Sequence, residues 1–124
     1  MEIVELETFN VFKENSVKME IPMMTDHVMA TMLLIDTNSK TLALNHPHTD
    51  KIYYIIEGSG VVTIGEESMD VKKGNLILVP NGSQHKYTTT TERLVILTIE
   101  ETQKKIPKME KTRERSNEAW EKNE

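Results

Sequence analysis

The sequence predicts an all-β fold, a sandwich or barrel, in a single domain. Short runs rich in β-branched and aliphatic residues recur along the first hundred residues, and clusters of turn-forming residues separate them. A chain of 124 residues is long enough for one domain with a modest core and too short for two. The expected strands are Ile3–Leu6, Ser16–Glu20, His27–Ile35, Thr41–His46, Ile52–Glu57, Val61–Ile64, Ser68–Val71, Leu76–Val79, His85–Thr89 and Leu94–Ile99, with turns at residues 36–39, 57–60, 65–67 and 89–92.

The composition is that of a globular domain. Charged residues make up 28% of the chain and hydrophobic residues 37%, which excludes a disordered segment. No window approaches the ~18 apolar residues of a membrane span, and the first residues lack the basic start and apolar core of an export signal. The chain has no cysteine and so no disulfide framework, which makes the cytoplasm the default expectation.

The charge is distributed unevenly between two segments. Residues 1–101 hold 8 Lys and Arg against 15 Asp and Glu, a balance of −7, whereas residues 102–124 hold 7 against 5, a balance of +2. An acidic body argues against a nucleic-acid partner, because phosphate contacts need a positive face. The residues from Lys108 to Asn123 favour a helix. We therefore expect a barrel domain over residues 1–101 and a charged C-terminal α-helix or tail over residues 102–124.

The segment from Gly74 to His85 carries the most specific pattern, G-x5-P-x-G-x2-H. It predicts a turn at Gly74 that needs a left-handed backbone, a buried strand over Leu76–Val79, and a tight turn at Pro80-Asn81-Gly82. His85 would then open the next strand. The pattern resembles the second signature of the cupin superfamily at every fixed position. That resemblance implies an antiparallel jelly-roll β-barrel, with His85 pointing inward as a metal ligand.

A degenerate form of the first cupin signature, G-x5-H-x-H-x3,4-E-x6-G, lies upstream and ends at Ile52–Gly58. Counting back without a gap, the glutamate position falls on Lys51 and the two histidine positions fall on His46 and Leu44. The opening glycine falls on Asn38, and asparagine is the usual substitute for glycine in a left-handed turn. In this register an ammonium group replaces the carboxylate ligand.

A second register takes His46-Pro47-His48 as the histidine pair, with Asp50 or Lys51 in the carboxylate position. Strand alternation favours the first register, because it places His46 on one face with the two leucines that precede it. His48 would then lie at the rim of the pocket.

The resemblance leads to two interpretations of the site, and both remain open at this point. In the first, a degenerate metal site leaves a partly cationic pocket for a small anionic molecule, because the ammonium of Lys51 would repel a divalent cation. The pocket residues would be His46, Lys51, Tyr53, His85 and Tyr87. These side chains could equally be ordinary interior residues of a barrel that folds without a ligand.

In the second interpretation, His46, His48 and His85 bind a divalent transition metal such as Zn, Ni, Mn or Fe. The protein would then be a metal-dependent cupin enzyme of the dioxygenase, decarboxylase or sugar-phosphate isomerase type. The family resemblance also leads us to expect a homodimer in which an N-terminal strand pairs across the interface, since small open barrels expose unpaired strand edges.

Overall fold

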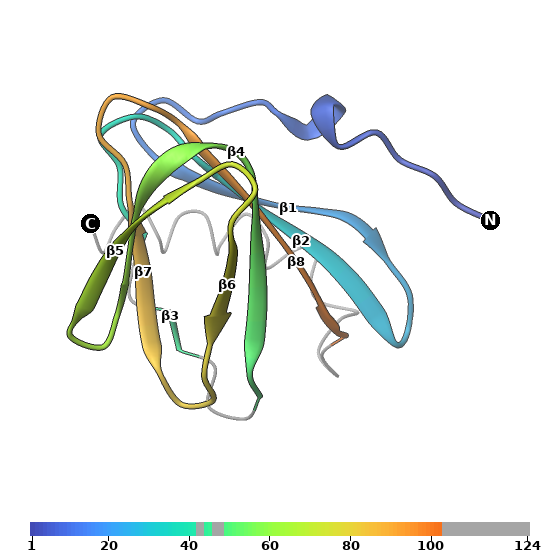
Figure 1. Cartoon of the computed structure of the whole chain (residues 1–124). Helices are drawn as coiled ribbons and strands as arrows, with labels where there is room; N and C mark the ends of the chain where they lie inside the picture. The colour runs from blue at the N-terminus through green and yellow to red at the C-terminus, as the bar shows by residue number, and fades with distance from the viewer. Residues whose placement is uncertain (42–43, 46–48, 103–124) are drawn as a thin grey trace.

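A computed structural model describes residues 1–41, 44–45 and 49–102, and Figure 1 shows their arrangement. The helix predicted between Lys108 and Asn123 lies outside the described residues. Within the described part of the chain, we find no helix with the length and hydrophobicity needed to cross a membrane. The elements are a 3-10 helix η1 (Leu6–Phe9) and the strands β1 (Val17–Met24), β2 (Val28–Ile35), β3 (Leu44–Asn45), β4 (Lys51–Ile64), β5 (Glu67–Lys72), β6 (Leu76–Val79), β7 (Gln84–Thr88) and β8 (Leu94–Glu101).

The strands form two antiparallel sheets that share β4. The first half of β4 pairs with β6 and β8, and β8 continues the first sheet to β2 and β1. The second half of β4 pairs with β5 and β7, and β7 continues the second sheet to β3. Figure 1 shows β4 curving from one sheet to the other. The all-β, antiparallel barrel predicted from the sequence is confirmed.

The continuity of β4 corrects the sequence analysis, which placed a turn at residues 57–60 between two strands. Gly58 has φ of 85° there, and a Cβ on it would lie 1.8 Å from the carbonyl oxygen of Arg93. The pairing with β8 shifts register between Ile55 and Glu57. A glycine with positive φ and a bulge therefore bend one long strand between the sheets instead of reversing it.

The N-terminal segment also differs from the prediction. Ile3–Leu6 is not a strand in this chain; Leu6 instead begins η1. Leu6, Phe9 and Phe12 pack against a small cluster on the outer face of the first sheet, formed by Met32, Leu34 and Val95. Burial of aromatic and aliphatic side chains, not backbone pairing, holds this segment in place.

The predicted turns with special backbone geometry are confirmed. Asn38 has φ of 53° and Gly74 has φ of 94°, both in the left-handed region that the sequence analysis required. His27, which the sequence analysis placed on a packed strand, instead lies exposed in the turn between β1 and β2, because β2 begins one residue later. Turn chemistry was thus predicted correctly at the positions where the backbone conformation excludes most residue types.

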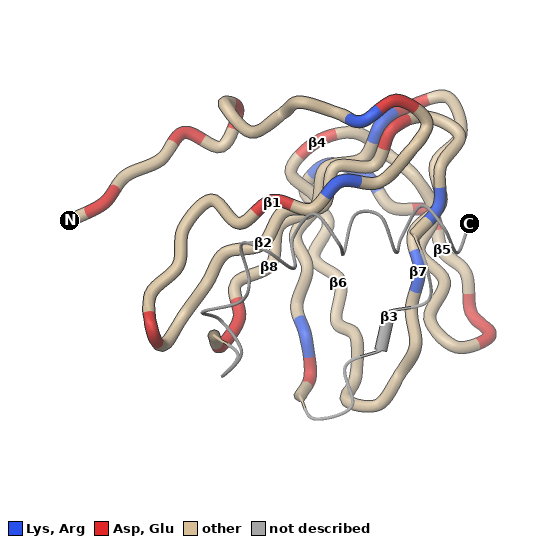
Figure 2. Tube along the Cα trace, turned by 180° about the vertical axis from the view of Figure 1, so that it is seen from behind, with Lys and Arg blue, Asp and Glu red and all other residues tan. Residues whose placement is uncertain are grey.

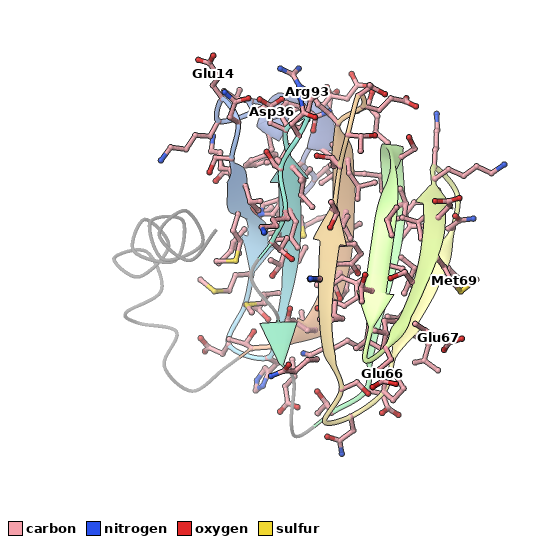
Figure 3. The ribbon with its side chains drawn as sticks, turned by 90° about the vertical axis from the view of Figure 1, so that its left-hand side faces the viewer. Glu14, Asp36, Glu66, Glu67, Met69 and Arg93 are labelled. Carbon is pink, nitrogen blue, oxygen red and sulfur yellow. The ribbon has the colours of Figure 1, made fainter. Side chains whose placement is uncertain are left out.

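The core lies between the two sheets, and toward one end the inward positions of β4 and β8 are apolar. Inward residues of β2, β4 and β8 alternate with outward ones, as antiparallel strands dictate. At this end the side chain of Asp36 joins two other segments of the chain. It accepts hydrogen bonds from Arg93 Nε at 2.9 Å and from the Asn15 backbone N–H at 2.8 Å (Figure 3). The buried cluster consists of Val17, Leu33, Ile35, Tyr53, Ile55, Val62, Val71, Ile77, Val79, Tyr87, Leu94 and Ile96.

Candidate functional site

The other end of the barrel interior is polar. Along β4 the inward positions change from Ile55 to Tyr53 and then to Lys51, all of them buried. Along β8 the inward positions change in the same direction, from Ile96 to Thr98 and then to Glu100. Tyr53 lies opposite Thr98 in the β4–β8 register. Two neighbouring strands therefore bring polar side chains to the same end of the core.

The most charged contact at this end is an ion pair between Lys51 and Glu100. Lys51 Nζ donates a hydrogen bond to Glu100 Oε1 at 2.9 Å, and the two side chains are only 8% and 12% exposed. A buried charge is tolerated when it is paired in this way. The pair brings two opposite charges to the interior without adding net charge.

Three aromatic rings form a cluster beside this pair. The ring centroids of Tyr53 and His85 are 5.1 Å apart, those of His85 and Tyr87 are 5.5 Å apart, and those of the two tyrosines are 5.9 Å apart. The two pairs that include Tyr87 meet edge to face, which aromatic quadrupoles favour. His85 and Tyr87 lie at alternate positions of β7 and are almost completely buried, so β7 supplies two of the three rings from the second sheet.

Both tyrosines are held in their protonated form. Burial raises the pKa of Tyr53 well above its usual range, and the negative charge of Glu100 raises it further. Burial raises the pKa of Tyr87 in the same way, with Tyr53 as the second cause. At neutral pH each phenol is therefore an O–H group that can donate a hydrogen bond.

The hydroxyl of Tyr87 has no hydrogen-bond partner within residues 1–41, 44–45 and 49–102, although the side chain is fully buried. The Oγ1 atom of Thr31 also lacks a hydrogen-bond partner within these described residues. Thr31 lies opposite Thr98 in the β2–β8 register. Buried polar atoms of native proteins are rarely left without a partner, because each one costs roughly 1–3 kcal/mol. The Tyr87 hydroxyl is therefore a candidate contact for a bound molecule.

The structure brings four of the predicted pocket residues into the barrel: Lys51, Tyr53, His85 and Tyr87 are all buried. His46 and His48 lie outside the described residues. The strand segments of the two cupin signatures are neighbours, since Leu44 of β3 is the register partner of His85. His85 therefore lies beside the β3 segment of the first signature.

Lys51 differs from its predicted role. The sequence predicts an uncompensated cation at this position, whereas in the structure Glu100 compensates its charge. Glu100 was missed because the predicted strand ended at Ile99. The sequence already indicated where the Glu100 side chain lies. Every second residue of this strand points inward, and Glu100 continues the inward series of Leu94, Ile96 and Thr98.

The described residues do not by themselves form a metal-binding set. Among them, no group of three or more His, Asp or Glu side chains is close enough to hold an ion. Thr88 lines two depressions, of ≈ 450 and ≈ 370 Å³, and the described residues that line them do not include the aromatic cluster. The polar end is the candidate site because of its buried ion pair, its aromatic cluster and the Tyr87 hydroxyl, not because of a large opening.

The fold is thus an antiparallel barrel in which the second sheet directs the imidazole of His85 and the phenol of Tyr87 into the polar end, while Tyr53 adds a second phenol from the first sheet. The family model described as "Cupin domain" matches residues 32–100. The match covers more than half of the chain, so the chain belongs to the cupin family.

Individual relatives match only parts of the chain. An uncharacterized protein of Methanocaldococcus jannaschii is 42% identical over 53 residues, 43% of this chain and 42% of that protein. Acireductone dioxygenase 1 of Oryza sativa subsp. japonica is 32% identical over 66 residues, 48% of this chain and 33% of that protein. The chain therefore spans less than half the length of either relative.

Solved structures extend the likeness of the fold over most of the chain. A protein of Thermus thermophilus superposes with a TM-score of 0.68 and 22% sequence identity, covering 79% of this chain and 97% of that one. At this level of identity the likeness establishes the fold alone.

Proposed function

We propose that this cupin binds a small molecule through the polar end of its barrel, and that the molecule presents an acceptor oxygen, as a small carboxylate does. The observation that carries this proposal is the Tyr87 hydroxyl, which is buried and lacks a hydrogen-bond partner among the described residues. A ligand oxygen that accepts this hydrogen bond would remove the cost of burying the hydroxyl alone.

The ion pair refines the chemistry of the proposed ligand. Because Glu100 neutralises Lys51, the pocket does not attract anions through net positive charge. Selection would rest on neutral donors, chiefly the phenols, which their raised pKa values keep protonated. His46 and His85 complete the proposed pocket with imidazole groups that can donate or accept.

Isothermal titration of the full chain with oxalate, pyruvate and malonate tests this proposal. We expect at least one acid to bind, and Tyr87→Phe to weaken its binding about tenfold, the equivalent of one hydrogen bond of ~1.4 kcal/mol. Tyr54→Phe is the matched control, because Tyr54 lies on β4 with its side chain directed outward and 40% exposed. Equal affinities in Tyr87→Phe and the parent protein would contradict the assigned role of the hydroxyl.

A second candidate function, a metal-dependent cupin enzyme, is favoured by the local identity with acireductone dioxygenase 1. The residues that would hold the metal are His46, His48 and His85. Elemental analysis of protein purified without a histidine tag distinguishes the two functions. About one equivalent of Zn, Ni, Mn or Fe, lost in His85→Ala, would support the enzyme; a metal-free protein that binds a small acid would support the first proposal.

A further inference from the structure

A second buried hydroxyl faces the barrel interior from the sheet opposite to that of Tyr87. Thr31 lies on β2 of the first sheet, at the same phase as Leu33 and Ile35 of the core cluster. The Thr31 side chain is therefore directed into the barrel, and the residue is only 8% exposed. Its Oγ1 atom lacks a hydrogen-bond partner among the described residues, as the Tyr87 hydroxyl does. Each hydroxyl therefore needs a partner that these residues do not supply.

The side chains beside Thr31 in the first sheet do not satisfy its hydroxyl. Thr98, the register partner of Thr31 on β8, donates its own hydroxyl proton to the carbonyl oxygen of Ile52 at 2.8 Å. Met29 and Leu33 flank Thr31 on the same face of β2, and neither side chain carries an O–H or N–H group. Valine has the same branched shape as threonine without the polar atom, so apolar packing alone does not require a threonine at this position.

One row of side chains connects the two hydroxyls across the polar end. Thr31 lies opposite Thr98, and Thr98 lies opposite Tyr53, so Thr31 and Tyr53 are two strand spacings apart, about 10 Å. The ring centroid of Tyr53 is 5.9 Å from that of Tyr87 on the second sheet. A molecule that lies along this row can therefore reach Tyr87 at one end and Thr31 at the other.

The charges around Thr31 favour a neutral ligand group at that end. Figure 2 shows no charged position along β2, so this strand offers no cation to a ligand. Met29, two positions from Thr31 on the same face, is the register partner of Glu100. A ligand carboxylate at Thr31 would be repelled by Glu100, whose buried cation Lys51 is already paired with it. A neutral hydroxyl or carbonyl oxygen avoids this repulsion.

We propose that Thr31 determines the specificity of the pocket, by selecting acids that carry a neutral hydroxyl or carbonyl oxygen at the end remote from their carboxylate. This inference rests on the proposed function, which assigns the carboxylate to Tyr87. The Thr31 hydroxyl can accept a hydrogen bond from an alcohol or donate one to a carbonyl oxygen. The ligand would bridge the two sheets and give both buried hydroxyls the partner that the described residues do not provide.

Isothermal titration of the full chain with paired acids tests the proposal. The terminal hydroxy acids β-hydroxypropionate, γ-hydroxybutyrate and δ-hydroxypentanoate are compared with propionate, butyrate and pentanoate, which lack only the hydroxyl. At least one hydroxy acid should bind about tenfold more tightly than its partner, and Thr31→Val should abolish this preference without changing the affinity for the unsubstituted acid. Thr63→Val is the matched control and should keep the preference, because the Thr63 hydroxyl is exposed and hydrogen-bonded to Ser68 at 2.8 Å.

The same titrations distinguish the role of Thr31 from that of the pocket. Equal affinities within every pair of acids, all weakened by Tyr87→Phe, would overturn the role of Thr31 and leave the proposed function standing. A preference that survives Thr31→Val would do the same. Succinate that binds more tightly than γ-hydroxybutyrate would show that the remote end accepts a carboxylate, against the proposal. If none of the acids binds, both proposals fail.

Thermal melts of the ligand-free protein test the Thr31 hydroxyl independently of any ligand. Thr31→Val should melt no lower than the parent protein, because it removes a buried hydroxyl that has no partner among the described residues. A melting temperature clearly below that of the parent would show that the hydroxyl is hydrogen-bonded within the protein. It would then not be available to a ligand, and the proposal would be overturned.

Discussion

The two ends of the barrel interior are built from the same strands but have opposite chemistry. At one end the inward residues of β4 and β8 are Ile55, Ile96 and Leu94, and all three are essentially inaccessible to water. Two to four residues away, the same strands place Tyr53 opposite Thr98 and bring Lys51 to Glu100. Strand alternation fixes which side chains point inward, but it does not fix their polarity.

The difference predicts unequal contributions of the two ends to stability. The apolar end stabilises the fold through burial, about 25 cal/mol per Å² of apolar surface. The polar end adds less stability, because each buried polar group must first lose its contacts with water. The function proposed above rests on these buried polar groups.

The largest contrast should come from two substitutions on the same strand. Ile96→Ala removes a fully buried side chain at the apolar end and should lower the free energy of unfolding by about 2–5 kcal/mol. Thr98→Ala removes the hydrogen bond from Thr98 Oγ1 to the Ile52 carbonyl and should cost about 1 kcal/mol. Urea unfolding measures both values. Similar losses from the two variants would refute the proposed difference between the ends.

Removal of one partner of the ion pair should have the next largest effect. Lys51→Met leaves the carboxylate of Glu100 without its buried cation and should cost about 2 kcal/mol, less than the ~3–5 kcal/mol of a fully buried pair, because Glu100 is 12% exposed. The double variant Lys51→Met with Glu100→Met should regain most of the loss. If the double variant is no more stable than the single one, the pair does not account for the cost.

Tyr87→Phe should raise stability, the opposite of the effect expected for a core substitution. The parent protein buries a hydroxyl that has no partner among the described residues, and phenylalanine fills nearly the same volume without it. We expect a gain of about 1 kcal/mol in the free energy of unfolding of the ligand-free protein. Tyr54→Phe, on the outer face, should change it by less than ~0.5 kcal/mol. A clear loss of stability in Tyr87→Phe would show that the hydroxyl is hydrogen-bonded in solution.

The smallest effect concerns acid stability at the apolar end. The hydrogen bond from Arg93, followed by that from the Asn15 N–H, lowers the pKa of Asp36 below its ordinary value of 3.8. The resulting stability is present above pH 3.8 and is lost as the pH falls through the lower pKa of the folded state. In thermal melts, Asp36→Asn should therefore be less stable than the parent protein at pH 7, with the difference narrowing below pH ~4. A difference that does not change with pH would exclude this linkage.

Much of the candidate site could be predicted from the sequence, because its strongest signals are local. The strand over Leu76–Val79 has the predicted bounds, and the left-handed turns at Asn38 and Gly74 follow from which residues tolerate positive φ. The inward orientation of Tyr53, His85 and Tyr87 follows from alternation once the strands are placed. Each of these conclusions depends only on a few neighbouring residues.

The tertiary structure alone decided the features that join distant parts of the chain. Gly58 bends β4 because the carbonyl of Arg93 passes close beside it, and a glycine followed by serine and glycine looks like a turn when that neighbour is unknown. Glu100 neutralises Lys51 across 49 positions of sequence, so the charge of the site could not be read from either segment alone. Backbone preferences are properties of single residues, whereas burial and ion pairing depend on which strands become neighbours.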